Sequence, residues 1–221
     1  IGKLFQSNQA YVLFLSITGG VNSFFADKGW LFGILLASAV ALVIIGGIKS
    51  IANAASRIVP SMAGLYLLSA LTILMLSIDK IDDALNLIIQ SAFGLGSFTG
   101  GAIGALIIGF QRSAFSNEAG MGTASIAHSA VETDEPISEG LVSLLEPFID
   151  TMVICTLTSL VIITTLYTND PSLGNLEGIA ITSAAFAYHI DWFHVVLGIA
   201  ALLFAFSTAI AWAYYGLKSC T

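Results

Sequence analysis

Six long runs of residues without a charged side chain constrain the fold of this chain more than any other feature. They are Leu4–Ala26, Trp30–Ile48, Ile58–Ile78, Ala84–Gln111, Thr151–Asn169 and Val195–Leu217. Each has about the length of a helix that crosses a hydrocarbon core, roughly 20 residues. In lipid only helices and closed barrels satisfy their own backbone groups, and these runs lack the polar and apolar alternation of barrel strands. The sequence therefore predicts an all-α fold, a polytopic transmembrane helical bundle.

The composition supports a membrane location. Of the 221 residues, 57% are hydrophobic and only 10% are charged, whereas a soluble domain carries about a quarter charged residues. The chain has no basic cluster, so we expect the lipid bilayer as a partner and no nucleic acid. It begins at Ile1 without a methionine and stops at Thr221 just past an apolar run. We therefore interpret residues 1–221 as a single transmembrane domain, truncated at both ends.

An enzymatic function is not indicated. An intramembrane enzyme needs paired aspartates or a serine–histidine pair within the apolar runs, and neither pattern occurs. The two cysteines, Cys155 and Cys220, are far apart and show no metal-ligand spacing, so we expect no cofactor. A passive channel and a purely structural membrane subunit remain alternatives to a transporter.

The fourth apolar run is unusually rich in glycine. Its glycines are Gly94, Gly96, Gly100, Gly101, Gly104 and Gly109. One interpretation is close helix packing, because Gly100 and Gly104 have the spacing at which small residues let helices approach. The other is a helix broken within residues 97–101, whose free backbone groups line a cavity and bind a carboxylate substrate. The glycines alone favour packing.

The last apolar run carries two adjacent hydroxyls, Ser207 and Thr208. Residues three and four positions apart share a helix face, so both hydroxyls lie near the carbonyl of Phe204. Three oxygens so grouped form part of a shell for a hard cation such as sodium. The alternative is that each hydroxyl bonds back to a carbonyl one turn earlier, and this segment alone favours that alternative. Trp212, one turn further on, either walls a pocket or faces lipid.

Several segments together resemble one family. They are residues 5–9 (FQSNQ), 46–51 (GGIKSI), 59–63 (VPSMA), 100–105 (GGAIGA), 112–128 (RSAFSNEAGMGTASIAH), 148–151 (FIDT) with 155–156 (CT), and 204–208 (FAFST). The chain is similar, over essentially its whole length, to the alanine/glycine:cation symporter family, the sodium:alanine symporters. The most specific match is FSNEAG with the following IAH. One departure is Ser113, where the family commonly has glycine.

The resemblance implies a leucine-transporter-type fold of two inverted five-helix repeats, with the six runs as helices three to eight. It also implies sodium-coupled symport of a small neutral amino acid, alanine or glycine, by alternating access. The expected substrate-binding residues are Phe98, Thr99, Gly100 and Gly101 on a broken sixth helix, Phe5 and Gln6 on the third, and Trp212 on the eighth. The expected sodium ligands are Phe204, Ser207 and Thr208.

Overall fold

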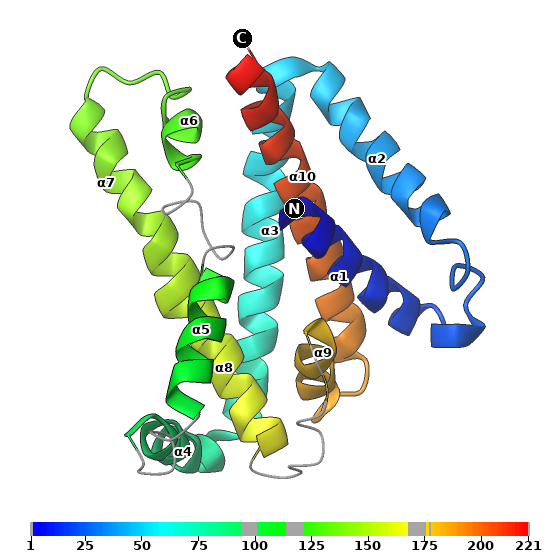
Figure 1. Ribbon diagram of the computed structural model, residues 1–221, viewed down its shortest axis with the longest axis vertical. Helices are drawn as coiled ribbons and strands as arrows, with labels where there is room; N and C mark the ends of the chain where they lie inside the picture. Colours follow the sequence, from blue (N-terminus) through cyan, green and yellow to red (C-terminus); the bar gives the residue numbers. More distant parts are fainter. Residues whose placement is uncertain (1, 94–100, 114–121, 168–175, 177, 221) are drawn as a thin grey trace.

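The computed structural model describes residues 2–93, 101–113, 122–167, 176 and 178–220, and these residues contain helices and no strand (Figure 1). Three helical stretches are long and apolar enough to cross a membrane, namely Gly47–Leu76, Pro136–Leu166 and Phe193–Ser219. The prediction of an all-α membrane protein is therefore confirmed for the described part of the chain.

The α-helices are α1 (Gly2–Ile17), α2 (Gly29–Ile45), α3 (Gly47–Leu76), α4 (Ile81–Phe93), α5 (Gly101–Ser113), α6 (Ala124–His128), α7 (Pro136–Pro147), α8 (Thr156–Ile162), α9 (Ile179–Ala187) and α10 (Phe193–Cys220). Short 3-10 helices span Gly20–Asn22 and Ile78–Lys80. Two π-helical segments, Phe148–Cys155 and Ile163–Tyr167, flank α8.

Helices α3 and α10 run side by side along the long axis, and α10 packs most extensively on α3 and α1 (Figure 1). The main buried cluster draws on α1, α3, α8, α9 and α10. Its largest fully buried side chain is Phe186 of α9, which packs among Tyr66 and Ile73 of α3. Helix α9 is thus anchored to the bundle by an aromatic side chain that has no contact with water.

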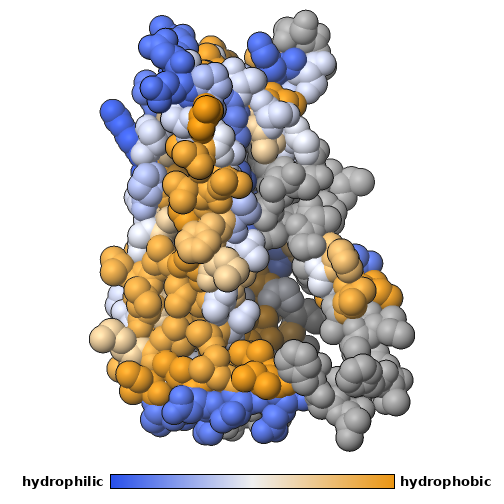
Figure 2. Space-filling view, turned by 90° about the vertical axis from the view of Figure 1, so that its left-hand side faces the viewer, coloured by the Kyte–Doolittle hydropathy of each residue, from blue (hydrophilic) through white to orange (hydrophobic). Residues whose placement is uncertain are grey.

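Figure 2 shows how the surface is divided. A broad apolar face covers much of the side of the molecule, and hydrophilic residues gather at both ends. Many large apolar side chains are exposed, among them Leu42, Met75 and Phe110. Exposed apolar surface of this extent fits contact with lipid or with further helices, because a water-facing protein buries such patches.

Helix α3 corrects one predicted boundary. The apolar runs Trp30–Ile48 and Ile58–Ile78 predict two helices with a break between them. The helix instead runs without interruption from Gly47 to Leu76 and contains Pro60. A proline inside a helix removes one backbone hydrogen bond, here the one to the carbonyl of Ser56. The hydroxyl of Ser61 donates to the carbonyl of Ile58 at 2.8 Å, so it does not replace that bond.

The helix expected over the apolar run Thr151–Asn169 also begins earlier, at Pro136, and its middle is π-helical. The π-helical segment starts directly after Pro147. Proline has no N–H to donate to the carbonyl four residues earlier, so the hydrogen-bond ladder loses its regular register at that point. Helix α9 was not predicted, because Ile179–Ala187 is too short to stand out as a membrane-length run.

The glycine-rich run contributes to two described helices. Helix α4 is seen end-on at the base of Figure 1, whereas α5 rises beside α8, so the two helices differ in direction. The predicted break within residues 97–101 lies mostly outside the described residues, and of its members only Gly101, the first residue of α5, is described.

Candidate functional site

The candidate sodium site centres on one turn of α10. Ser207 is buried, and its hydroxyl donates to the carbonyl oxygen of Phe204 at 3.0 Å. The back-bond expected of a membrane serine is therefore present. It also brings two of the three predicted oxygens together. Within α10 the Phe204 carbonyl accepts both this hydroxyl and the helical N–H of Thr208, so the lone pairs that stay free are those of the Ser207 oxygen. Thr208 follows on the same turn and is half-buried.

Helix α3 forms the wall behind this turn. The sulfur of Met62 lies 3.7 Å from the Ser207 hydroxyl oxygen. One turn further along α3, the ring of Tyr66 meets the ring of Phe204 edge-on, with centroids 6.5 Å apart and planes at 89°. Both α3 side chains are buried. The turn that carries the predicted sodium ligands is therefore backed from one helix by a sulfur atom and an aromatic ring.

Helix α1 lies antiparallel to α10, and two contacts fix their register. A Cβ at Gly198 would lie 2.0 Å from Cδ1 of Ile17, and Ala10 is buried in one cluster with Ala205. Continued along both helices, this register brings the beginning of α1 level with the part of α10 that follows Thr208. Figure 1 shows the beginning of α1 beside α10.

Four of the predicted site residues therefore lie at one level. Phe5 and Gln6 of α1 are exposed, with 49% of the Phe5 surface accessible, and Thr208 and Trp212 of α10 are half-buried. The Trp212 ring packs on Tyr215, at a centroid distance of 6.2 Å. None of these four side chains is buried in the described part of the structure.

The glycine-rich part of the predicted site is not brought to α10 by the described residues. Phe98, Thr99 and Gly100 lie outside them, and Gly101 begins α5. In Figure 1 α5 runs beside α7 and α8, apart from α10, and it is not among the helices that α10 contacts extensively. The predicted substrate role of these residues stays a prediction.

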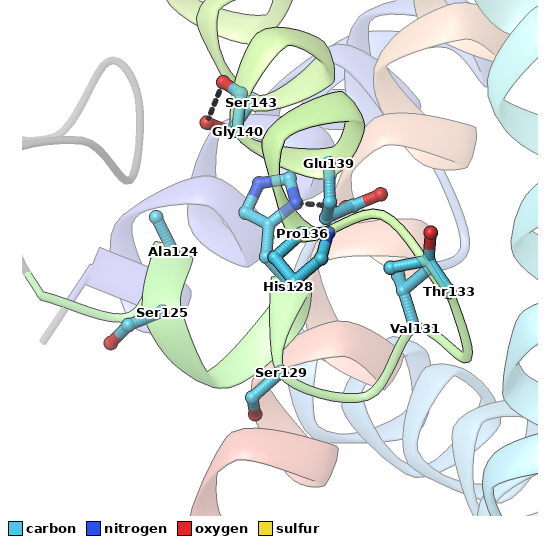
Figure 3. A pocket seen from close by; sticks show the side chains of 10 residues that line it. All are labelled: Ala124, Ser125, His128, Ser129, Val131, Thr133, Pro136, Glu139, Gly140 and Ser143. Atoms are coloured by element: carbon cyan, nitrogen blue, oxygen red, sulfur yellow. Dashed lines mark hydrogen bonds and ion pairs between the residues drawn. The ribbon is translucent and has the colours of Figure 1, made fainter.

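A separate cavity of about 490 Å³ lies between α6 and α7 (Figure 3). His128 and Glu139 meet in it, with 2.5 Å between the imidazole Nδ1 and a carboxylate oxygen. The other residues that line the cavity have small, uncharged side chains: Ala124, Ser125, Ser129, Val131, Thr133, Pro136, Gly140 and Ser143. His128 thus joins the short α6 to the first turn of α7.

At the opposite end of α3, His189 contacts Ser77. The imidazole Nε2 lies 2.6 Å from the serine hydroxyl oxygen, and Ser77 is fully buried. Burial lowers the pKa of His189 below its usual range; Lys80 lowers it further, and Asp79 opposes the shift. The neutral imidazole is therefore favoured in this contact between the end of α3 and the α9–α10 connection.

Two interactions that sequence reasoning missed join distant helices. Gln9 of α1 accepts a hydrogen bond from the backbone N–H of Ile179 at 3.1 Å, at the start of α9. Tyr66 bonds through its hydroxyl to Thr158 of α8. The only signal of either interaction in the sequence was a polar side chain within an apolar run. Such a signal indicates that a hydrogen-bond partner exists, because a buried tyrosine hydroxyl needs one, but it does not identify the partner.

These features define the class of protein. The membrane-length helices and the broad apolar flank of the described residues belong to a multi-pass, helical membrane protein. The sequence matches the Sodium:alanine symporter family over residues 1–221. The chain belongs to this family, and the family is one of transporters.

Individual relatives agree with this assignment. The chain is 41% identical over 190 residues to an uncharacterized transporter of Haemophilus influenzae, covering 83% of this chain and 41% of the relative. It is 40% identical over 219 residues to the sodium/alanine symporter AgcS of Methanococcus maripaludis, covering 99% and 47%. It is 36% identical over 217 residues to the probable sodium/glutamine symporter GlnT of Bacillus subtilis, covering 97% and 44%. The chain thus spans less than half of the length of these relatives.

Proposed function

We propose that this chain is part of a sodium-coupled symporter that carries a small neutral amino acid, alanine or glycine, across the plasma membrane. The observation that carries the proposal is the α10 turn, in which the Phe204 carbonyl and the Ser207 hydroxyl lie together beside Thr208. The similarity to AgcS, which is named a sodium/alanine symporter, supports sodium and alanine as the transported pair. Residues 1–221 would form part of one transmembrane domain.

In this proposal sodium is the coupling ion and no other cofactor takes part. Phe204, Ser207 and Thr208 supply part of an oxygen shell, which a hard cation requires. The remaining ligands come from a part of the transporter outside this chain, as expected for a leucine-transporter-type inverted repeat in which the six apolar runs are helices three to eight.

The amino acid binds next to this turn. Phe5 and Gln6 of α1 and Trp212 of α10 lie level with Thr208 and would form the side-chain wall of the pocket. Phe98 to Gly101 would supply the backbone groups that bind the carboxylate, because the N-terminus of a half-helix attracts an anion. A pocket bounded by two aromatic rings and glycine backbone is small, which favours alanine or glycine over bulky amino acids.

The energy for transport follows from the charge of the ion. Sodium binding orders the site, one bundle of helices rocks against the other, and the site opens to the inside. One positive charge moving down the membrane potential releases about 2.3 kcal/mol per 100 mV. That free energy supports about fifty-fold accumulation of the substrate per sodium ion, because about 1.4 kcal/mol corresponds to a factor of ten.

The test uses the full-length protein in proteoliposomes with labelled alanine. Thr208→Ala should raise the sodium concentration for half-maximal uptake, because it removes one oxygen ligand. The matched control is Thr72→Ala on α3, where an exposed hydroxyl donates to the carbonyl of Leu68 at 2.7 Å. Sodium dependence unchanged by Thr208→Ala would remove that residue from the site.

Two further measurements separate the alternatives. Uptake of alanine against its own gradient, driven by sodium and abolished when potassium replaces it, excludes a passive pore, a structural subunit and an enzyme without transport activity. Competition by unlabelled glycine and glutamine decides the substrate. Glutamine is included because the similar protein GlnT is named a probable sodium/glutamine symporter. Stronger competition by glutamine than by glycine would overturn the small-substrate proposal.

A further inference from the structure

The buried tyrosine Tyr66 joins three elements around the candidate sodium turn. Its hydroxyl pairs with Thr158 of α8. Its ring lies 5.5 Å from the ring of Phe186 on α9, with planes at 31°, and 6.5 Å from that of Phe204 on α10. These distances fall within the range at which aromatic pairs attract each other. Tyr66 is therefore the point at which α8, α9 and α10 meet on α3.

The direction of the hydrogen bond follows from the neighbouring contact. The Thr158 hydroxyl donates its hydrogen to the carbonyl of Ile154 at 2.7 Å. A hydroxyl has one hydrogen, so the Thr158 oxygen accepts and the Tyr66 hydroxyl donates. Ile154 belongs to the π-helical segment Phe148–Cys155. The tyrosine is thus tied to the irregular part of its neighbouring helix by a chain of two hydrogen bonds.

Helix α3 meets the α10 turn at two points one turn apart. Met62 contacts the hydroxyl of Ser207, and Tyr66 contacts the ring of Phe204. Residues four apart lie on one helix face, so both contacts come from the same side of α3. Rotation of α10 about its axis would move the Phe204 carbonyl, Ser207 and Thr208 together, and it would have to break both contacts.

We propose that Tyr66 is the positioning residue of the sodium site. Its hydrogen bond to Thr158 holds its ring against Phe204, and this contact, with Met62 against Ser207, fixes the rotation of α10 at which the ligand oxygens face the ion. The inference rests on the proposed function, because it presupposes a sodium site on α10. Tyr66 itself does not touch the ion.

The test measures the sodium dependence of the full-length transporter in two ways. One is labelled alanine uptake into proteoliposomes over a range of NaCl, with KCl keeping the ionic strength constant. The other is the rise of the thermal unfolding midpoint of the purified protein with NaCl, which reports binding without transport. Tyr66→Phe should raise the half-saturating sodium concentration about 2- to 10-fold in both, the range that corresponds to one net hydrogen bond.

Variants of the partner show whether this hydrogen bond is the cause. Thr158→Ser keeps the hydroxyl and should behave as the wild type, whereas Thr158→Val should match Tyr66→Phe. The double variant Tyr66→Phe/Thr158→Val should be no worse than either single change, because both remove the same bond. The matched control is Tyr11→Phe, since the Tyr11 hydroxyl donates to the carbonyl of Phe25 at 2.7 Å and takes no part in the contact between Tyr66 and Thr158.

A general loss of structure gives a different result. If Tyr66→Phe only lowers the maximal rate or the yield and leaves the half-saturating sodium concentration unchanged, the inference is overturned. If Thr208→Ala shifts sodium dependence and Tyr66→Phe does not, the inference fails and the proposed function stands. If uptake does not depend on sodium in the wild type, the proposed function itself fails. A shift in Tyr66→Phe without one in Thr208→Ala also overturns the inference, since Tyr66 would then act on another site.

Discussion

Replacing Gly178 with alanine should make α9 open more often from the bundle, and the structure gives the size of the change in the free energy of opening. Gly178 precedes α9 with φ 60° and ψ −135°, a backbone conformation that residues with a Cβ rarely adopt. Holding alanine there costs about 1–3 kcal/mol. The new Cβ would also lie 2.7 Å from the side-chain oxygen of Gln9, the atom that accepts the Ile179 N–H.

The clash itself is relieved cheaply, because the end of the Gln9 side chain can turn away. Turning away breaks its hydrogen bond to Ile179, at a cost of about 0.5–1.5 kcal/mol. The two contributions together lower the free energy of opening α9 by about 1.5–4.5 kcal/mol. At about 1.4 kcal/mol per factor of ten, the α9 amides should exchange with solvent roughly ten- to a thousandfold faster.

Hydrogen–deuterium exchange of the full-length protein in nanodiscs, followed by mass spectrometry of peptides covering Ile179–Ala187, measures this directly. Gly216→Ala, at an exposed glycine near the end of α10 with no atom near its Cβ position, is the control and should leave α9 unchanged. Gln9→Ala alone should accelerate exchange by about two- to tenfold. In the Gln9→Ala background, Gly178→Ala should raise the exchange rate further only by the amount that the backbone strain at Gly178 causes. Unchanged exchange of α9 in Gly178→Ala would refute the reasoning.

Two other predictions concern packing and protonation. Gly198→Ala should lower the thermal unfolding midpoint, because overpacking against Cδ1 of Ile17 costs about 1–3 kcal/mol. Adding Ile17→Val to this variant removes the Cδ1 atom and should restore the midpoint. Failure of this rescue would contradict the close contact between α1 and α10. The pKa of His189 is lowered, so the folded state favours the neutral imidazole. The contribution of the neutral His189 to the free energy of unfolding is present above the ordinary histidine pKa of about 6.5. It is lost as the pH falls through the lowered pKa of the folded state. The thermal midpoint of the wild type should therefore drop on acidification below about pH 6.5 more than that of His189→Gln, and equal slopes would contradict this assignment.

The sequence predicted the helices whose apolar runs are well separated from polar segments. Helices α2 and α10 begin and end within a few residues of the expected positions, whereas α1 ends at Ile17, well before its apolar run ends at Ala26. It failed where a helix continues through polar residues, as α3 does from Gly47, because hydropathy marks the hydrocarbon region and not the end of the hydrogen-bond ladder. It also missed α9, which is stabilised by burial of Phe186 in the bundle and not by its own length.

The candidate site was predictable to the extent that it is local. The contact between Ser207 and Phe204 follows from helix geometry, since residues three apart share a face. Phe5 and Gln6 lie at about the same height along the bundle as Thr208 and Trp212 because of the antiparallel register of α1 and α10. No periodicity within either helix specifies that register.

The sequence by itself determined the membrane class, the family and the oxygen-bearing turn of α10, because these depend on composition, on matching motifs and on the fixed geometry of one helix. Only the tertiary structure decided that Tyr66 meets Thr158, 92 residues away, and that Gln9 caps α9 from 170 residues away. The physical reason is that side chains on different helices meet through packing, and packing is set by the shape of the whole bundle.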